Sequence, residues 1–122
     1  MFDRRTKNVT IFKDSMEMMS ENERLHQAIK ESVEKQTLYL EAENVEIPES
    51  NASKCRTLVS TGRSFETASR YARNGKKVCV LNFASATNPG GGVVHGSSAQ
   101  EESFCRCSTL YPGLEIDKMW QE

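Results

Sequence analysis

Apolar residues recur at helical spacing early in the chain. Leu25, Ile29 and Val33 follow one another every fourth residue within an otherwise charged stretch. This period predicts a helix with one apolar stripe. Ser20 and Glu23 have the spacing of a capping box at the start of that helix. We therefore predict that residues 1–50 form an N-terminal helical segment.

The pattern changes to strand and helix signals after a polar break at residues 48–53. Residues 57–60 and 78–84 are short apolar runs typical of β-strands. Between them, Ser64 is a candidate N-cap and Gly75 a candidate C′ residue of a second helix. Strand, helix and strand in this order predict a βαβ unit with a right-handed crossover. The fold class that we expect is α/β.

A glycine triplet follows the second predicted strand, within the run Asn88-Pro89-Gly90-Gly91-Gly92. In open α/β sheets, ligands bind beyond the carboxyl ends of strands. Glycines without a Cβ let backbone N–H groups approach a phosphate closely. The run lacks the lysine of a P-loop and the spacing of the dinucleotide-binding fingerprint. It is either a phosphate-binding loop or only a flexible turn.

A spacer of seven residues separates the triplet from Gln100-Glu101-Glu102, which contains two adjacent glutamates. Ser98 and Glu101 have capping-box spacing, so one explanation is that the carboxylates complement the positive end of a helix. The other is chemistry at a glycosidic bond. Adjacent helical residues point about 100° apart, so the pair cannot face each other as in ordinary glycosidases. One carboxylate would hold ribose hydroxyls and the other would act as general acid and then base.

Composition and charge limit the classes of function. The chain has 122 residues, enough for one small domain, and no apolar run approaches the length of a membrane helix. The N-terminus lacks the apolar stretch of a signal peptide, and we predict a cytoplasmic protein. The net charge of −1 argues against a general nucleic-acid-binding protein. Residues 54–77 are rich in lysine and arginine, which forms either a solvated helix face or a positive rim for an anionic ligand.

The remaining reactive side chains do not predict a metal site. Cys105 and Cys107 lack the C-x-x-C spacing of zinc ligands, and no histidine pair accompanies them. We expect the four cysteines to be reduced thiols. His95 lies between the glycines and the glutamates, either as an exposed loop residue or as one that shapes the loop.

The glycine triplet, the spacer and the Gln-Glu-Glu tripeptide together resemble the signature of poly(ADP-ribose) glycohydrolases. Residues 80–92 and 100–114 resemble the bacterial-type branch of that family. The resemblance implies a macrodomain-like mixed sheet with flanking helices, whose first part would be residues 51–122. Residues 1–50 would then be an accessory helical segment. It implies no cofactor and no metal, since backbone N–H groups would neutralise the pyrophosphate.

The resemblance also implies roles for individual residues. Glu102 matches the catalytic acid and base, and Glu101 matches the neighbour that holds the ribose hydroxyls. Gly90, Gly91 and Gly92 match the loop against the diphosphate and the distal ribose. Asn88 would contact that ribose, and Gln100 would support the loop. The implied partners are ADP-ribose, its polymer and ADP-ribosylated proteins, with neither a membrane nor a specific nucleic-acid sequence among them.

Two alternatives to a hydrolase remain. One is a macrodomain-like module that binds ADP-ribose without hydrolysis. The other is an inactive fragment, because the family domain continues with further strands, a second phosphate-binding loop and an adenine-stacking aromatic residue. We expect the 122-residue chain alone to be poorly stable and to have little activity.

Overall fold

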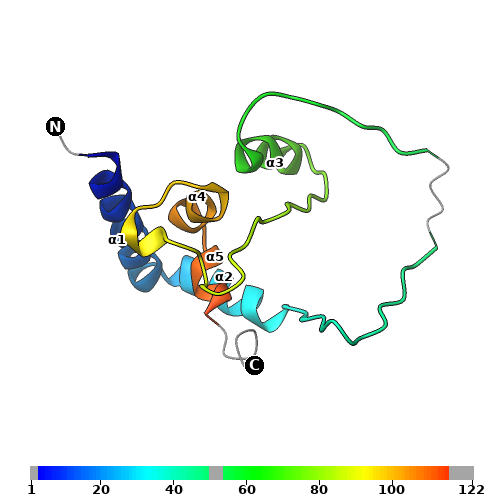
Figure 1. The fold of residues 1–122 in the computed structure, drawn as a ribbon, viewed down its shortest axis with the longest axis horizontal. Coiled ribbons are helices and arrows are strands. Elements are labelled where there is room, and N and C mark those ends of the chain that lie inside the picture. Colours follow the sequence, from blue (N-terminus) through cyan, green and yellow to red (C-terminus); the bar gives the residue numbers. More distant parts are fainter. Residues whose placement is uncertain (1–2, 50–53, 116–122) are drawn as a thin grey trace. The chain divides into compact units, whose positions relative to one another are not determined.

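The computed structural model describes residues 3–49 and 54–115, and the regular elements within these ranges are helical. They are α1 (Arg4–Glu21), α2 (Glu23–Glu34), α3 (Ser64–Arg73), the 3₁₀ turn η1 (Val93–His95), α4 (Gln100–Cys107) and α5 (Leu110–Leu114), shown in Figure 1.

The chain divides into two compact units. The first, which we call the site unit, comprises residues 1–36 and 81–122 and holds α1, α2, η1, α4 and α5. The second, which we call the middle segment, comprises residues 37–80 and holds α3. The N-terminal helices and the glycine–glutamate region, which are far apart in sequence, therefore belong to the same unit. The predicted domain boundary after residue 50 lies outside the described residues.

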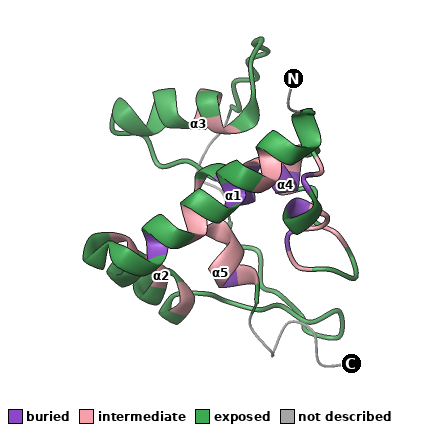
Figure 2. Ribbon diagram, turned by 90° about the vertical axis from the view of Figure 1, so that its left-hand side faces the viewer, coloured by how far each residue is buried: buried purple, intermediate pink, exposed green. Residues whose placement is uncertain are grey.

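Helix α1 is the centre of the site unit and contacts α2, η1 and α4. Phe12 of α1, Val93 of η1 and Cys105 of α4 form the buried cluster. Tyr111 packs on this cluster, and its ring meets Phe12 edge to face with centroids 5.0 Å apart. In Figure 2, the purple, buried part in the middle of α1 lies beside the buried part of α4, and a second buried part of α1 lies near α2.

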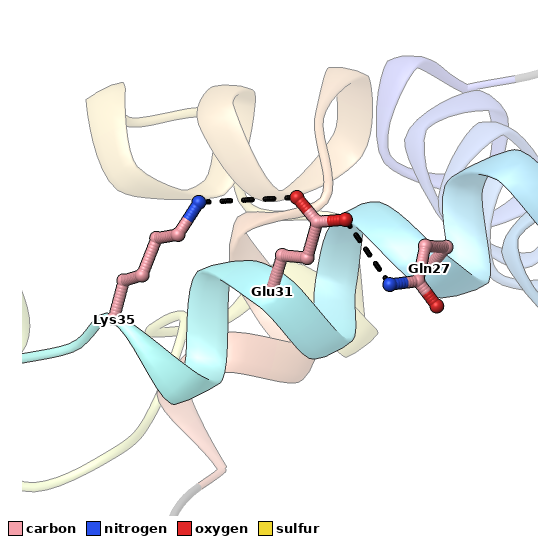
Figure 3. A network of polar contacts seen from close by, with 3 residues as sticks. All are labelled: Gln27, Glu31 and Lys35. Carbon is pink, nitrogen blue, oxygen red and sulfur yellow. Dashed lines mark hydrogen bonds and ion pairs between the residues drawn. The ribbon is translucent and has the colours of Figure 1, made fainter.

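Helix α2 forms as its apolar period predicts. Leu25, Ile29 and Val33 are each partly buried, which confirms the predicted stripe. The predicted cap is two residues too early: Asn22 is the N-cap, and its side chain accepts hydrogen bonds from the backbone N–H groups of Arg24 and Leu25. The polar face carries a ladder shown in Figure 3. Glu31 accepts from Gln27 at 3.1 Å and lies 3.9 Å from the ammonium of Lys35.

Helix α3 of the middle segment also forms as predicted, with one shift at its start. Arg63 is the N-cap, and the Glu66 carboxylate accepts from its backbone N–H. Gly75 follows the C-cap residue Asn74 and has φ +72°, the left-handed conformation expected at C′.

The predicted α/β fold is wrong for this structure, because no strand occurs among residues 3–49 and 54–115. The apolar runs 57–60 and 78–84 belong to no helix or strand, and Val59 is 96% exposed and Phe83 70% exposed. A strand satisfies its backbone polar groups only through a neighbouring strand, whereas a helix satisfies its own. At residues 83 and 85, side chains of α4 take this role: the N–H of Phe83 donates to Gln100 and that of Ser85 to Glu101. The mixed sheet is therefore absent from the described residues.

No helix among the described residues is long and apolar enough to cross a membrane.

Candidate functional site

The glycine loop is a tight turn that leads directly into η1. Gly90 and Gly91 have φ of +70° and +59°, a region that residues with a Cβ rarely adopt. The N–H of Gly91 donates to the carbonyl of Asn88 at 3.0 Å, and that of Val93 donates to the carbonyl of Gly90 at 3.2 Å. The triplet therefore forms a folded turn with defined hydrogen bonds.

Glu102 of α4 reaches this turn. Its Oε1 accepts a hydrogen bond from the N–H of Gly92 at 3.1 Å, and the residue is only 8% exposed. A buried carboxylate requires hydrogen-bond donors to offset the loss of water, and the glycine backbone supplies one.

Glu101 reaches a different part of the chain. Its Oε2 accepts from the N–H of Ser85 at 2.8 Å, and its Oε1 lies 3.5 Å from the side-chain nitrogen of Asn82. Glu101 is 4% exposed. The capping box predicted for Ser98 and Glu101 does not form, because Ala99 is the N-cap of α4 and no side chain caps it. Both carboxylates accept hydrogen bonds from the loops that precede α4.

The two carboxylates nevertheless converge on one residue, Gly91. A Cβ at Gly91 would lie 2.6 Å from Oε1 of Glu102 and 3.4 Å from Oε2 of Glu101. Side chains that leave the helix in different directions thus meet at the backbone of the turn. Glycine is favoured at position 91 because its φ is positive and because the Glu102 carboxylate occupies the space that a Cβ would take.

The other predicted site residues lie around this point. Oε1 of Gln100 accepts from the N–H of Phe83 at 2.7 Å, so Gln100 holds the segment that enters the loop. Asn88 is exposed, and its backbone carbonyl supports the turn at Gly91. His95 is exposed at the end of η1. Their roles toward a ligand stay predictions.

Arg106 is a buried charge that was not predicted from the sequence. It is 9% exposed, and its guanidinium donates to the carbonyl of Ser97 and, at 3.1 Å, to the hydroxyl of Ser103. The contact with Ser97 ties the far end of the glycine loop to α4. The sequence feature that could have indicated Arg106 is its position four residues after Glu102, because residues four apart share a face of a helix.

Cys105 lies in the core beneath the two carboxylates. Burial and the negative charges of Glu101 and Glu102 raise the pKa of its thiol to about 12. A thiol with such a pKa stays protonated near neutral pH, so it is a core side chain and not a nucleophile. Among the described residues, no group of three or more His, Cys, Asp and Glu side chains could hold a metal ion.

Comparison with known families identifies the chain. The family model for the catalytic domain of microbial-type PARG, the poly(ADP-ribose) glycohydrolases, matches residues 6–121. No curated protein matches the chain, and no solved structure does. The match covers both the N-terminal helices and the glycine–glutamate region, and the chain therefore belongs to the microbial-type PARG catalytic domain family.

Proposed function

We propose that the site hydrolyses the ribose–ribose glycosidic bonds of poly(ADP-ribose) and releases ADP-ribose. Membership of a glycohydrolase family supports the reaction class. The observation that carries the assignment to residues is the convergence of the Glu101 and Glu102 carboxylates on Gly91. Carboxylate oxygens beside the turn can accept hydrogen bonds from the hydroxyl groups of a ribose.

Glu102 is the general acid and base in this proposal. Its carboxyl group gives a proton to the glycosidic oxygen as the bond from that oxygen to the anomeric carbon breaks. The resulting carboxylate then takes a proton from a water molecule, whose oxygen bonds to the oxocarbenium-like carbon. The protons balance, and Glu102 returns to its starting state. The hydrogen bond from Gly92 supports this role because it fixes the carboxylate at the edge of the loop.

Glu101 holds the ribose hydroxyls, and Gly90, Gly91 and Gly92 lie along the diphosphate. The buried position of Glu101 and its bond from Ser85 support a fixed, acceptor-only group suited to sugar hydroxyls. Gln100 supports the loop by its bond to Phe83. The exposed Asn88 contacts the distal ribose in this proposal.

The test is ADP-ribose release from the polymer by the wild-type chain and by Glu102→Gln. The amide can still accept from Gly92 but cannot exchange a proton, so we expect release to fall roughly 100- to 10,000-fold while polymer binding persists. Glu66→Gln is the matched control, because Glu66 also lies in the first turn of a helix and accepts from the backbone N–H of its own N-cap residue, Arg63. Equal turnover by wild type and Glu102→Gln would contradict the role of Glu102.

A second candidate is a module that binds ADP-ribose without hydrolysis. The bonds from Gly92 to Glu102 and from Ser85 to Glu101 favour it, since both carboxylates would then only brace the loop. Calorimetry with ADP-ribose beside the release assay separates the candidates. Binding without release supports the binding module, release supports the hydrolase, and neither supports the inactive fragment.

A further inference from the structure

One face of α1 carries polar and apolar residues in an alternating order. Asn8, Phe12, Ser15 and Met19 follow one another at helical spacing, so they form one stripe. Phe12 and Met19 are 6% and 7% exposed, and Asn8 and Ser15 are partly buried. Two partly buried polar side chains require hydrogen-bond partners to offset the loss of water.

Both partners belong to the candidate site. The side-chain nitrogen of Asn8 donates to the carbonyl of Gly96 at 3.0 Å, at the end of the glycine loop. The hydroxyl of Ser15 donates to the carbonyl of Arg106 at 2.7 Å, on the helix that carries Glu101 and Glu102. Helix α1 thus holds the two halves of the site by one hydrogen bond each.

The packing between these two bonds is close. Phe12 lies between Asn8 and Ser15 along the stripe and contacts Val93 and Cys105 in the core. At Gly96, φ is +78°, and a Cβ there would collide with the backbone carbonyl of Arg5. The loop therefore rests directly on the backbone of α1, with glycine at the point of contact.

We propose that Asn8 and Ser15 are positioning residues for the site, and that α1 sets the distance between the glycine loop and the Glu102 carboxylate. Ser15 follows Asn8 by seven positions. The helix therefore spans about 10 Å between these two anchoring residues and acts as a rigid spacer. The bond from Gly92 to Glu102 then forms in one geometry. The expected effect on catalysis rests on the proposed hydrolysis. The positioning of the loop rests only on the contacts of α1.

The variants separate the hydrogen bond from packing. Asn8→Asp keeps the size of the side chain but cannot donate to the Gly96 carbonyl. Asn8→Ala removes both the hydrogen-bond donor and the packing of the side chain. Thr10→Ala is the matched control, since the Thr10 hydroxyl donates to Thr6 within α1 and is exposed. Ser15→Ala pairs in the same way with Ser20→Ala, because Ser20 donates to Glu17 of its own helix.

The first readout is amide hydrogen exchange of the full 122-residue chain, which requires no turnover. Gly92, Gly96 and Ser97 donate within the loop or to Glu102. We expect their exchange to be about fivefold faster in both Asn8 variants, the effect of losing one hydrogen bond. The amides of α2 should be unchanged, and Thr10→Ala should match wild type throughout.

The second readout is the split between kcat and KM. A displaced acid should lower kcat by roughly tenfold or more and leave KM within about twofold. Unchanged loop exchange in both Asn8 variants would overturn the proposal, and so would equal acceleration in α2, which would indicate general loosening. If the wild type releases no ADP-ribose, the proposed function fails, and exchange alone still decides whether α1 positions the loop.

Discussion

The site unit contains a buried apolar cluster and the middle segment does not, although both expose some large apolar residues. In the site unit, Phe12, Val93 and Cys105 are buried together, and the charged residues Glu101 and Glu102 are buried beside them. In the middle segment, no described residue is buried, although it contains Leu58 and Val59. An aliphatic residue of the middle segment, Val59, is therefore far more exposed than the two carboxylates of the site unit.

This difference shows what determines burial here. The helices of the site unit satisfy their own backbone groups and need only a neighbouring helix to cover one face. The apolar runs of the middle segment lie outside its helix, and as strands they would need a partner strand to cover their side chains. Glu101 and Glu102 are buried because loop N–H groups meet their oxygens, which makes their burial a property of the site and not of hydrophobicity.

The largest expected effect comes from opening the core of the site unit. Phe12→Ala should lower the free energy of unfolding by about 3–5 kcal/mol, because it removes a ring packed on Val93, Cys105 and Tyr111. Val59→Ala in the middle segment should stay within about 0.5 kcal/mol, since Val59 is 96% exposed. Urea denaturation of both variants tests the contrast, and equal destabilisation would break it.

The second prediction concerns the reactivity of one cysteine thiol in each region, Cys105 in the site unit and Cys79 in the middle segment. The pKa of Cys105 is raised from 9.0 to about 12, mainly by burial and then by Glu101 and Glu102, so its thiolate is roughly a thousandfold scarcer near pH 8. The exposed Cys79 should react with a thiol reagent long before Cys105 does. Peptide mapping after timed labelling measures this, and equally fast labelling of Cys105 would show that the site unit opens readily.

The same shift predicts a pH dependence of stability. Because the folded chain holds the proton of Cys105 more tightly than the unfolded chain, its contribution to stability is complete below about pH 9 and is lost as pH rises toward 12. Cys105→Ala should remove this part of the alkaline loss, and an unchanged alkaline limb of the denaturation curve would contradict the assignment.

A smaller effect separates two glycines with the same backbone conformation. Gly91 has φ +59° and Gly75 has φ +72°, but an added Cβ would meet other atoms within 4 Å at Gly91 and none at Gly75. Gly75→Ala should cost about 1 kcal/mol from backbone strain alone. Gly91→Ala should cost about 2 kcal/mol or more and should also impair ADP-ribose release, because the added Cβ displaces the Glu102 carboxylate. Urea denaturation and the release assay measure the two effects, and equal effects of the two substitutions would show that the convergence on Gly91 is unimportant.

The sequence predicts those parts of the structure that depend on local signals. The stripe of Leu25, Ile29 and Val33 and the C′ glycine Gly75 follow from helical period and backbone freedom alone. The caps are less well predicted, since Asn22 and Arg63 take the places expected for Ser20 and Ser64. The predicted strands are wrong because an apolar run indicates that a segment needs a partner strand, but not that the chain provides one.

The proximity of the glycine triplet and the two glutamates was predicted from the sequence, and their individual contacts were not. The spacing of Gly90, Gly91 and Gly92 from Glu101 and Glu102 pointed to one site, and the structure brings them together at Gly91. The contacts of Asn8, Ser15 and Arg106 could not be derived, because those of Asn8 and Ser15 join distant parts of the chain and that of Arg106 depends on the fold of the glycine loop. The sequence feature that could have indicated the contacts of Asn8 and Ser15 is the presence of these polar residues within the stripe of α1.

The decisive measurement compares bond cleavage by Glu101→Gln and Glu102→Gln with that of the wild type, with the protein in excess over polymer. We predict that Glu102→Gln lowers the cleavage rate by roughly a hundredfold or more with binding retained, and that Glu101→Gln loses mainly binding. Cleavage by Glu102→Gln at the wild-type rate would contradict the assignment of Glu102 as the general acid and base.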